Sequence, residues 1–162
     1  MKYERAYDRT HKGVQLVTFR LGAEYYGIHV SKVREILRPL ELFPVPGMGK
    51  HIEGVINLRG EIIPIAKLHL LLGIDAGAGA QKGRMIILET SRGSFGFFVD
   101  EVLEVTRIQT EEMQASPELA KREGRPDVVT GIARVSGRMV VCLNSEKLIP
   151  DDVMAKELAI GG

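Results

Sequence analysis

Several residue types that mark particular classes of protein are rare or missing in this chain of 162 residues. It has no tryptophan and only 6% aromatic residues, so we do not expect the stacking platforms that bind single-stranded nucleic acid. Its 22 Lys and Arg residues nearly cancel its 21 Asp and Glu residues. The resulting net charge of +1 argues against an interface with a phosphate backbone. We therefore predict no binding to nucleic acid.

Residues that could hold a metal ion or react covalently are scattered along the chain. The single cysteine, Cys142, lies in the apolar run MVVCL, which favours a small buried core residue over a reactive thiol. One cysteine allows no internal disulfide, which is typical of a reducing cytoplasm. The four histidines stand singly, without a pair spaced for one helix face. We predict no metal site, no cofactor and no catalytic residues, and hence no enzyme.

Long hydrophobic runs are also absent, since no apolar stretch approaches the length of a transmembrane helix. Residues 1–13 are too polar for a signal peptide, and their alternating charges indicate a mobile tail. The chain as a whole is 44% hydrophobic, which is ordinary for a globular fold. We expect a cytoplasmic protein without direct membrane insertion.

The segment Gly54–Leu72 contains two dense apolar runs with Arg59 and Gly60 between them. Glycine tolerates a positive φ, so the runs can fold back as an antiparallel hairpin with Arg59 at its tip. Asn57 lies two residues earlier on the same strand face. Because both faces of the hairpin are apolar, we expect it to be a central element of a β core with one polar tip.

The sequence repeats itself. Residues 16–37 align without a gap with residues 85–106, which pairs Gly27 with Gly96. Residues 54–63 align with residues 131–140 at a slightly larger offset, and Gly60 meets Gly137. The additional residues fall in the polar stretch 114–126, where insertion costs little. We interpret the chain as a duplicated β unit.

This duplication predicts an all-β fold of two five-stranded antiparallel barrels with short helices, packed on a shared hydrophobic core. We expect one domain over residues 14–150, divided into subdomains at about 14–76 and 84–150. A small-residue linker, 73–83, separates them. After Val30 the spacing favours one helical turn before the chain extends again. Residues 151–162 are expected to form a short helix and a tail.

Three polar residues, Glu35, Asn57 and Arg59, are not explained by the fold alone. Asn57 and Arg59 could simply shape and solubilise a turn. The second copy, however, carries Arg134 and Ser136 at the corresponding positions. Folding alone would allow the two turns to be alike, so the difference suggests a role for the first tip.

An ordered series of motifs resembles one family, the chemotaxis coupling proteins or CheW-like family. The motifs are Val33-Arg34-Glu35-Ile36, then Pro44-x-Pro46, then the sequence GVINLRGEIIPI from Gly54 to Ile65. The resemblance runs from about Leu16 to Leu148. It departs at Lys67-Leu68-His69, where many relatives carry an Asp before the Leu.

The resemblance implies two SH3-like barrels and an adaptor without catalysis. Such an adaptor joins the cytoplasmic tip of methyl-accepting chemoreceptors to the regulatory domain of a CheA-type histidine kinase, in membrane-associated receptor arrays. The implied kinase-binding residues are Gly54, Asn57, Leu58, Arg59 and Gly60. The implied adaptor surface of the first barrel comprises Val33, Glu35, Ile36 and Leu37. Candidates for a receptor-binding groove between the barrels are Met85, Ile86, Val99, Val102 and Val105.

A rival hypothesis is a small-ligand or enzymatic domain that uses the groove between two duplicated barrels as its pocket. Convergent polar residues that would serve such a pocket are not evident in the sequence. The adaptor is therefore the leading interpretation.

Overall fold

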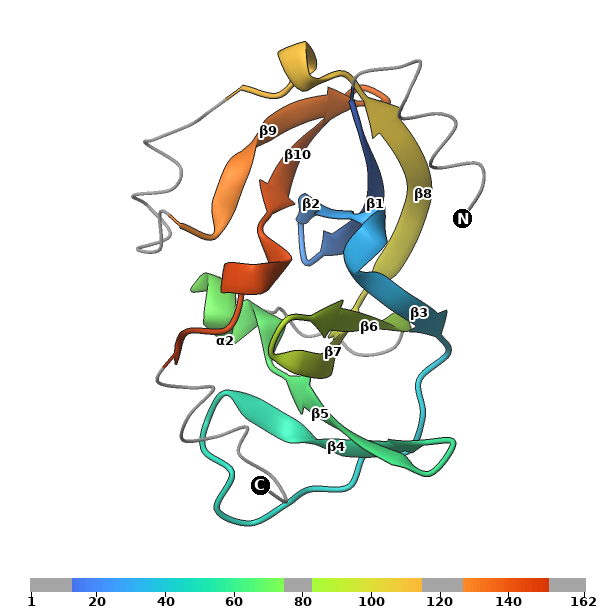
Figure 1. Cartoon of the computed structure of the whole chain (residues 1–162), viewed down its shortest axis with the longest axis vertical. Helices are drawn as coiled ribbons and strands as arrows, with labels where there is room; N and C mark the ends of the chain where they lie inside the picture. Colours follow the sequence, from blue (N-terminus) through green and yellow to red (C-terminus); the bar gives the residue numbers. More distant parts are fainter. Residues whose placement is uncertain (1–12, 75–82, 115–126, 152–162) are drawn as a thin grey trace.

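The computed structural model describes residues 13–74, 83–114 and 127–151, which form two five-stranded sheets. Figure 1 shows them one above the other, and we call them the upper and the lower barrel. The strand order of the upper barrel is β8-β1-β2-β10-β9, and that of the lower barrel is β3-β6-β7-β5-β4. An all-β fold of two five-stranded units is thus confirmed.

The elements of each barrel come from both halves of the sequence. The upper barrel contains β1 (Val14–Leu21), β2 (Glu24–His29), β8 (Glu101–Ile108), β9 (Val129–Val135) and β10 (Arg138–Leu143). The lower barrel contains β3 (Val33–Leu37), β4 (Ile52–Leu58), β5 (Glu61–Ala66), β6 (Arg84–Thr90) and β7 (Gly93–Val99). The helical turns are η1 (Val30–Lys32), α2 (Leu68–Leu72), η2 (Thr110–Glu112) and η3 (Ser145–Lys147).

The expected division into subdomains at 14–76 and 84–150 is therefore wrong. The first two strands of each repeat form a hairpin in one barrel, and its last three strands lie in the other. The chain crosses from the upper barrel to the lower through η1, and it returns at Asp100 between β7 and β8. The duplication seen in the sequence is real, but its two copies exchange strands.

The strands of both barrels pair mainly antiparallel, as predicted, but the exchange adds one parallel pair to each barrel. In the upper barrel β10 runs parallel to β2, with Cys142 opposite Gly27. In the lower barrel β5 runs parallel to β7, with Ile65 opposite Gly96. These pairs join strands of different repeats, so no short hairpin turn is needed between them.

The edges of the two sheets are connected in the same way. Phe43, after β3, forms an isolated bridge with Val55 of β4. Gln114, after η2, forms the corresponding bridge with Ile132 of β9. The expectation that the hairpin of β4 and β5 is a central element is therefore wrong. In the described part of the chain β4 is an edge strand, and the bridge to Phe43 lies along it.

The barrels share one hydrophobic core, as predicted. Its buried side chains come from β1 and β2 above, from β6 and β7 below, and from α2. The rings of Phe19 in β1 and Phe97 in β7 lie 5.7 Å apart across the junction. Smaller clusters fill each barrel separately. Cys142 belongs to the upper cluster and is buried, as the sequence indicated.

The junction has a polar rim around this core. Glu146 of η3 accepts hydrogen bonds from the Ser91 backbone N–H and hydroxyl, in the turn between β6 and β7, and from Lys32 of η1. Arg92 in the same turn donates to the backbone carbonyls of Glu146 and Ile149. The hydrogen bond to Ser91 is the main cause that lowers the pKa of Glu146 from 4.5 to about 2, with Lys32 adding to it.

The predicted helical turn after Val30 exists as η1, and the chain then extends as β3. Three further expectations concern residues 1–13, 73–83 and 151–162, most of which lie outside the described residues.

Candidate adaptor surface

The tip of the hairpin formed by β4 and β5 is a tight two-residue turn. Arg59 and Gly60 have φ angles of 51° and 89°, which is the conformation of a type I′ turn. The Asn57 side-chain oxygen accepts a hydrogen bond of 2.8 Å from the Gly60 N–H. Asn57 thus shapes the turn, as one of the two interpretations proposed. The result is a tip whose backbone is fixed.

The Arg59 guanidinium donates to the Glu35 carboxylate of β3 in an ion pair. The Arg59 side chain is 65% exposed and that of Glu35 is 24% exposed. Two residues that sequence reasoning selected in separate segments therefore meet at one place. The pair connects the hairpin tip to the edge strand β3.

A second ion pair beside it was not selected from the sequence. Arg34 donates to both carboxylate oxygens of Glu61, at 2.7 and 3.1 Å, and to the Ser94 hydroxyl at 3.1 Å. The hydrogen bond between Arg34 and Glu61 lowers the pKa of Glu61 and raises that of Arg34. Ser94 in turn donates to Glu89 at 2.6 Å. Because Arg34 precedes Glu35, adjacent residues of β3 contact the start of β5 and the tip.

The five expected kinase-binding residues divide into two groups. Asn57, Arg59 and Gly60 are exposed at the tip, whereas Gly54 and Leu58 are buried and present no surface. A Cβ at Gly54 would lie 2.7 Å from the Phe43 carbonyl oxygen, so glycine permits the bridge to β4. Leu58 packs in the cluster of the lower barrel. These two residues support the tip from within.

The expected adaptor surface on β3 is likewise mixed. Ile36 is exposed and Glu35 is reached from the tip, but Val33 packs against the shared core and Leu37 against the lower cluster. The structure adds an apolar residue that was overlooked, Ile62, which is 54% exposed. Ile62 is the cross-strand partner of Asn57. Since directly opposite residues share a face, the exposed Asn57 was the signal that could have identified it.

Further exposed hydrophobic side chains lie in the segment between β3 and β4: Leu40, Phe43 and Val45. Isolated apolar side chains are common on protein surfaces, so exposure alone gives these three no role. We define the tip surface as Glu35, Ile36, Asn57, Arg59, Gly60 and Ile62.

The predicted receptor-binding groove is not formed by the five residues proposed for it. Met85 and Ile86 are 0% exposed and Val99 is 1% exposed. The reason is that β6 and β7 each have a neighbouring strand on both sides, and their side chains pack into the shared core and the lower cluster. Met85 points into the lower cluster and Ile86 into the shared core. Only Val105, on β8, is strongly exposed, and Val102 is half-buried against the shared core.

The upper barrel repeats the geometry of the tip with different chemistry. Ser136 and Gly137 form the equivalent turn, with φ angles of 50° and 79°. The Ser136 hydroxyl donates to the Glu104 carboxylate at 2.8 Å, where the lower barrel has Arg59 and Glu35. The contact between tip and strand is thus common to both barrels, whereas the first turn position carries a cation, Arg59, in the lower barrel and Ser136 in the upper one.

The described residues hold no grouping suited to a metal ion. Among residues 13–74, 83–114 and 127–151, no three His, Cys, Asp or Glu side chains lie close enough together to ligate one. Within those ranges, no helix has the length and apolar character that crossing a bilayer requires.

Comparison with known proteins identifies the family. A family model described as the CheW-like domain matches residues 15–153. The chain is 30% identical to the chemotaxis protein CheW of Treponema pallidum, over 88% of this chain and 85% of that protein. It is also 30% identical to the chemotaxis protein CheW of Thermotoga maritima, over 90% of this chain and 93% of that protein.

A solved structure agrees with these matches. The scaffolding protein TtCheW from Thermoanaerobacter tengcongensis has a TM-score of 0.74 and 31% identity, covering 84% of this chain and 87% of that one. The fold is therefore that of a chemotaxis scaffold. The chain belongs to the CheW-like family, and its function is that of a chemotaxis signal-transduction adaptor.

Proposed function

We propose that this adaptor links the cytoplasmic tip of methyl-accepting chemoreceptors to the regulatory domain of a CheA-type histidine kinase, and that it does so without catalysis. The observation that supports this most directly is the Arg59–Glu35 ion pair on an exposed, rigid hairpin tip. We assign the kinase contact to the tip surface. The protein would work in the cytoplasm, recruited to receptor arrays at the membrane.

The composition of the tip surface supports this assignment. Arg59 lies in the same hairpin as the exposed Ile62. Its partner Glu35 lies on the same strand as the exposed Ile36. Interfaces combine apolar side chains with a few arginines that anchor binding. The I′ turn and the Asn57 hydrogen bond hold the backbone before binding, so little conformational entropy remains to be lost there.

We propose that the receptor tip, a helical hairpin, contacts the upper barrel near its junction with the lower one. Of the five groove residues expected from the resemblance, Val102 and Val105 on β8 are the two that keep exposed surface. An apolar stripe of a receptor helix could bury these side chains. Met85, Ile86 and Val99 would act only by supporting the sheets from within.

The proposal is tested by reconstituting a CheA-type kinase, receptor fragments and this protein, and by measuring kinase activity with and without the adaptor. Arg59→Ala is expected to weaken binding to the kinase regulatory domain and to reduce receptor-dependent activation. Arg134→Ala is the matched control, because Arg134 is exposed on β9 at the position equivalent to Asn57. Full activation without the adaptor, or equal loss with both variants, would contradict the proposal.

A further inference from the structure

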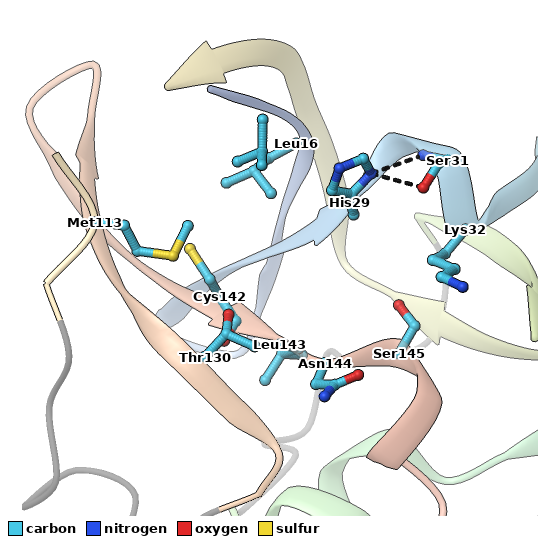
Figure 2. A pocket seen from close by; sticks show the side chains of 11 residues that line it. Leu16, His29, Ser31, Lys32, Met113, Thr130, Cys142, Leu143, Asn144 and Ser145 are labelled. Carbon is cyan, nitrogen blue, oxygen red and sulfur yellow. Dashed lines mark hydrogen bonds between the residues drawn. The ribbon is translucent and has the colours of Figure 1, made fainter. Parts of the chain in front are cut away.

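The upper barrel contains a pocket of about 510 Å³ that the adaptor function does not use (Figure 2). Its lining includes residues of η1 and η3, and Val14 at the start of β1. Its apolar wall consists of Val14, Leu16, Met113, Cys142 and Leu143. A pocket of this size matches the range that small molecules occupy in proteins.

The internal repeat shows that this space depends on a few small or polar side chains. When the alignments of the two copies are continued, Cys142 corresponds to Ile65 of the lower barrel and Leu16 to Met85. Ile65 and Met85 are 0% exposed and fill the lower cluster.

The residues on the polar side of the pocket also differ from their equivalents in the lower barrel. His29 corresponds to Phe98 and Ser145 to Leu68, so apolar side chains occupy the equivalent places below. At Cys142, His29 and Ser145 the upper barrel thus carries a smaller or more polar side chain than its own internal copy.

That polar end holds a buried hydroxyl without a protein partner. Ser145 is 5% exposed, and its Oγ makes no hydrogen bond within the described part of the chain. In Figure 2 this hydroxyl points from η3 toward His29. A buried polar atom of this kind is costly unless something in the pocket pairs with it.

His29 supplies a second donor on the same side. Its Nδ1 accepts from the Ser31 backbone N–H at 3.2 Å and lies 2.7 Å from the Ser31 hydroxyl. In the neutral ring the proton is then on Nε2, which is left to donate. Lys32 lies at the rim, and one of its three N–H groups is used by Glu146 at 2.9 Å.

The charge of the lining selects the ligand. The ionisable side chains that line the pocket are His29, Lys32 and Cys142, and none of the lining residues is an acid. We propose that the pocket binds a small amphipathic monocarboxylate. Its alkyl chain lies against Leu16, Met113 and Cys142, and its carboxylate accepts hydrogen bonds from Ser145 and His29 near the Lys32 ammonium.

Titration of the full chain with octanoate, octanol and octylamine tests this proposal by two-dimensional NMR and calorimetry. Octanoate is expected to shift resonances of Leu16, Met113 and Leu143 with a Kd near or below about 1 mM. Octanol binds about tenfold more weakly because it lacks the charge, and octylamine more weakly still because cations line the rim. Absence of saturable octanoate binding, or equal binding of octylamine, overturns the proposal.

Variants locate the site. Cys142→Ile copies the lower barrel and is expected to weaken octanoate binding at least tenfold by filling the pocket. Ser145→Ala keeps the shape of the pocket and weakens binding about fivefold, so the proposal stays testable if Cys142→Ile fails to fold. Met139→Ile, on an exposed face of the same strand, is the control and leaves binding unchanged. Unaltered octanoate affinity in Ser145→Ala overturns the assigned carboxylate position.

Discussion

The Arg59 guanidinium pairs with the Glu35 carboxylate, 24 residues earlier in the chain. The pair brings the edge strand β3 and the hairpin tip together on one exposed surface of the lower barrel. Because the Arg59 side chain is mostly exposed, the pair contributes little to folding, and a second role at an interface is consistent with its position.

Arg59→Ala is expected to reduce affinity for the kinase regulatory domain by about tenfold or more, since truncating an interface arginine often costs about 1–2 kcal/mol or more. Stability should change by no more than about 0.5–1 kcal/mol. Calorimetric binding and urea unfolding measure the two effects. The double variant with exchanged charges, Arg59→Glu with Glu35→Arg, separates a role in stability from a role in binding. Recovery of stability without recovery of binding indicates that the partner contacts Arg59 itself. A much lower melting temperature of Arg59→Ala would instead show that Arg59 stabilises the fold.

Glu146 makes stability depend on pH. Its pKa is lowered from 4.5 to about 2 in the folded protein, chiefly by the hydrogen bond from Ser91. The unfolded chain therefore takes up the proton first as the pH falls. The stabilising effect is complete above about pH 4.5 and is lost progressively as the pH approaches about 2.

Urea unfolding at pH 7, pH 4 and pH 3 should show this loss in the unmodified protein and a weaker dependence in Glu146→Gln. Glu111→Gln, at an exposed position in η2, is the matched control. An unchanged pH dependence in Glu146→Gln would contradict the assignment.

Cys142 should react slowly with a thiol reagent such as dithionitrobenzoate. Burial raises the pKa of its thiol to about 11, so little thiolate is present at pH 8. We expect labelling of the folded protein to be at least about a hundredfold slower than labelling in denaturant. Equal rates in both conditions would show that the upper barrel opens readily.

Gly96→Ala should destabilise the protein more than Gly27→Ala, although the two glycines are equivalent in the repeat. A Cβ at Gly96 would lie 2.6 Å from Ile87 Cδ1 and 3.1 Å from the Ile86 carbonyl oxygen. At Gly27 the nearest atoms are side-chain carbons of Val140 and Leu16, at 3.1 and 3.2 Å. We expect a cost of about 1–3 kcal/mol for Gly96→Ala and a smaller one for Gly27→Ala, measured by urea unfolding. The reverse order would contradict this packing.

A fragment ending near Gly77 should not fold alone. It carries β1 to β5, but the upper barrel also needs β8, β9 and β10, and the lower barrel needs β6 and β7. Its share of the common core would be left in water. Mixing it with the fragment from 78 to 162 should restore a cooperative thermal transition that neither fragment shows by itself. A cooperative transition of the first fragment alone would contradict the shared core.

The sequence by itself determined the local features of this protein. The ungapped match of residues 16–37 with 85–106 identified the duplicated unit, Arg59-Gly60 specified the turn, and the run around Cys142 indicated a buried strand. The resemblance of the motifs identified the family. These features depend on neighbouring residues, on turn chemistry and on composition, and all three can be read from the local sequence.

The tertiary structure alone decided which strands pair and which faces are covered. Alternation along Met85 and Ile86 distinguishes two faces but does not reveal that both are buried. The exchange of strands between barrels and the meeting of Glu35 with Arg59 depend on contacts between distant segments. Such contacts arise from the shared core, which buries apolar surface that neither half of the sequence can bury alone.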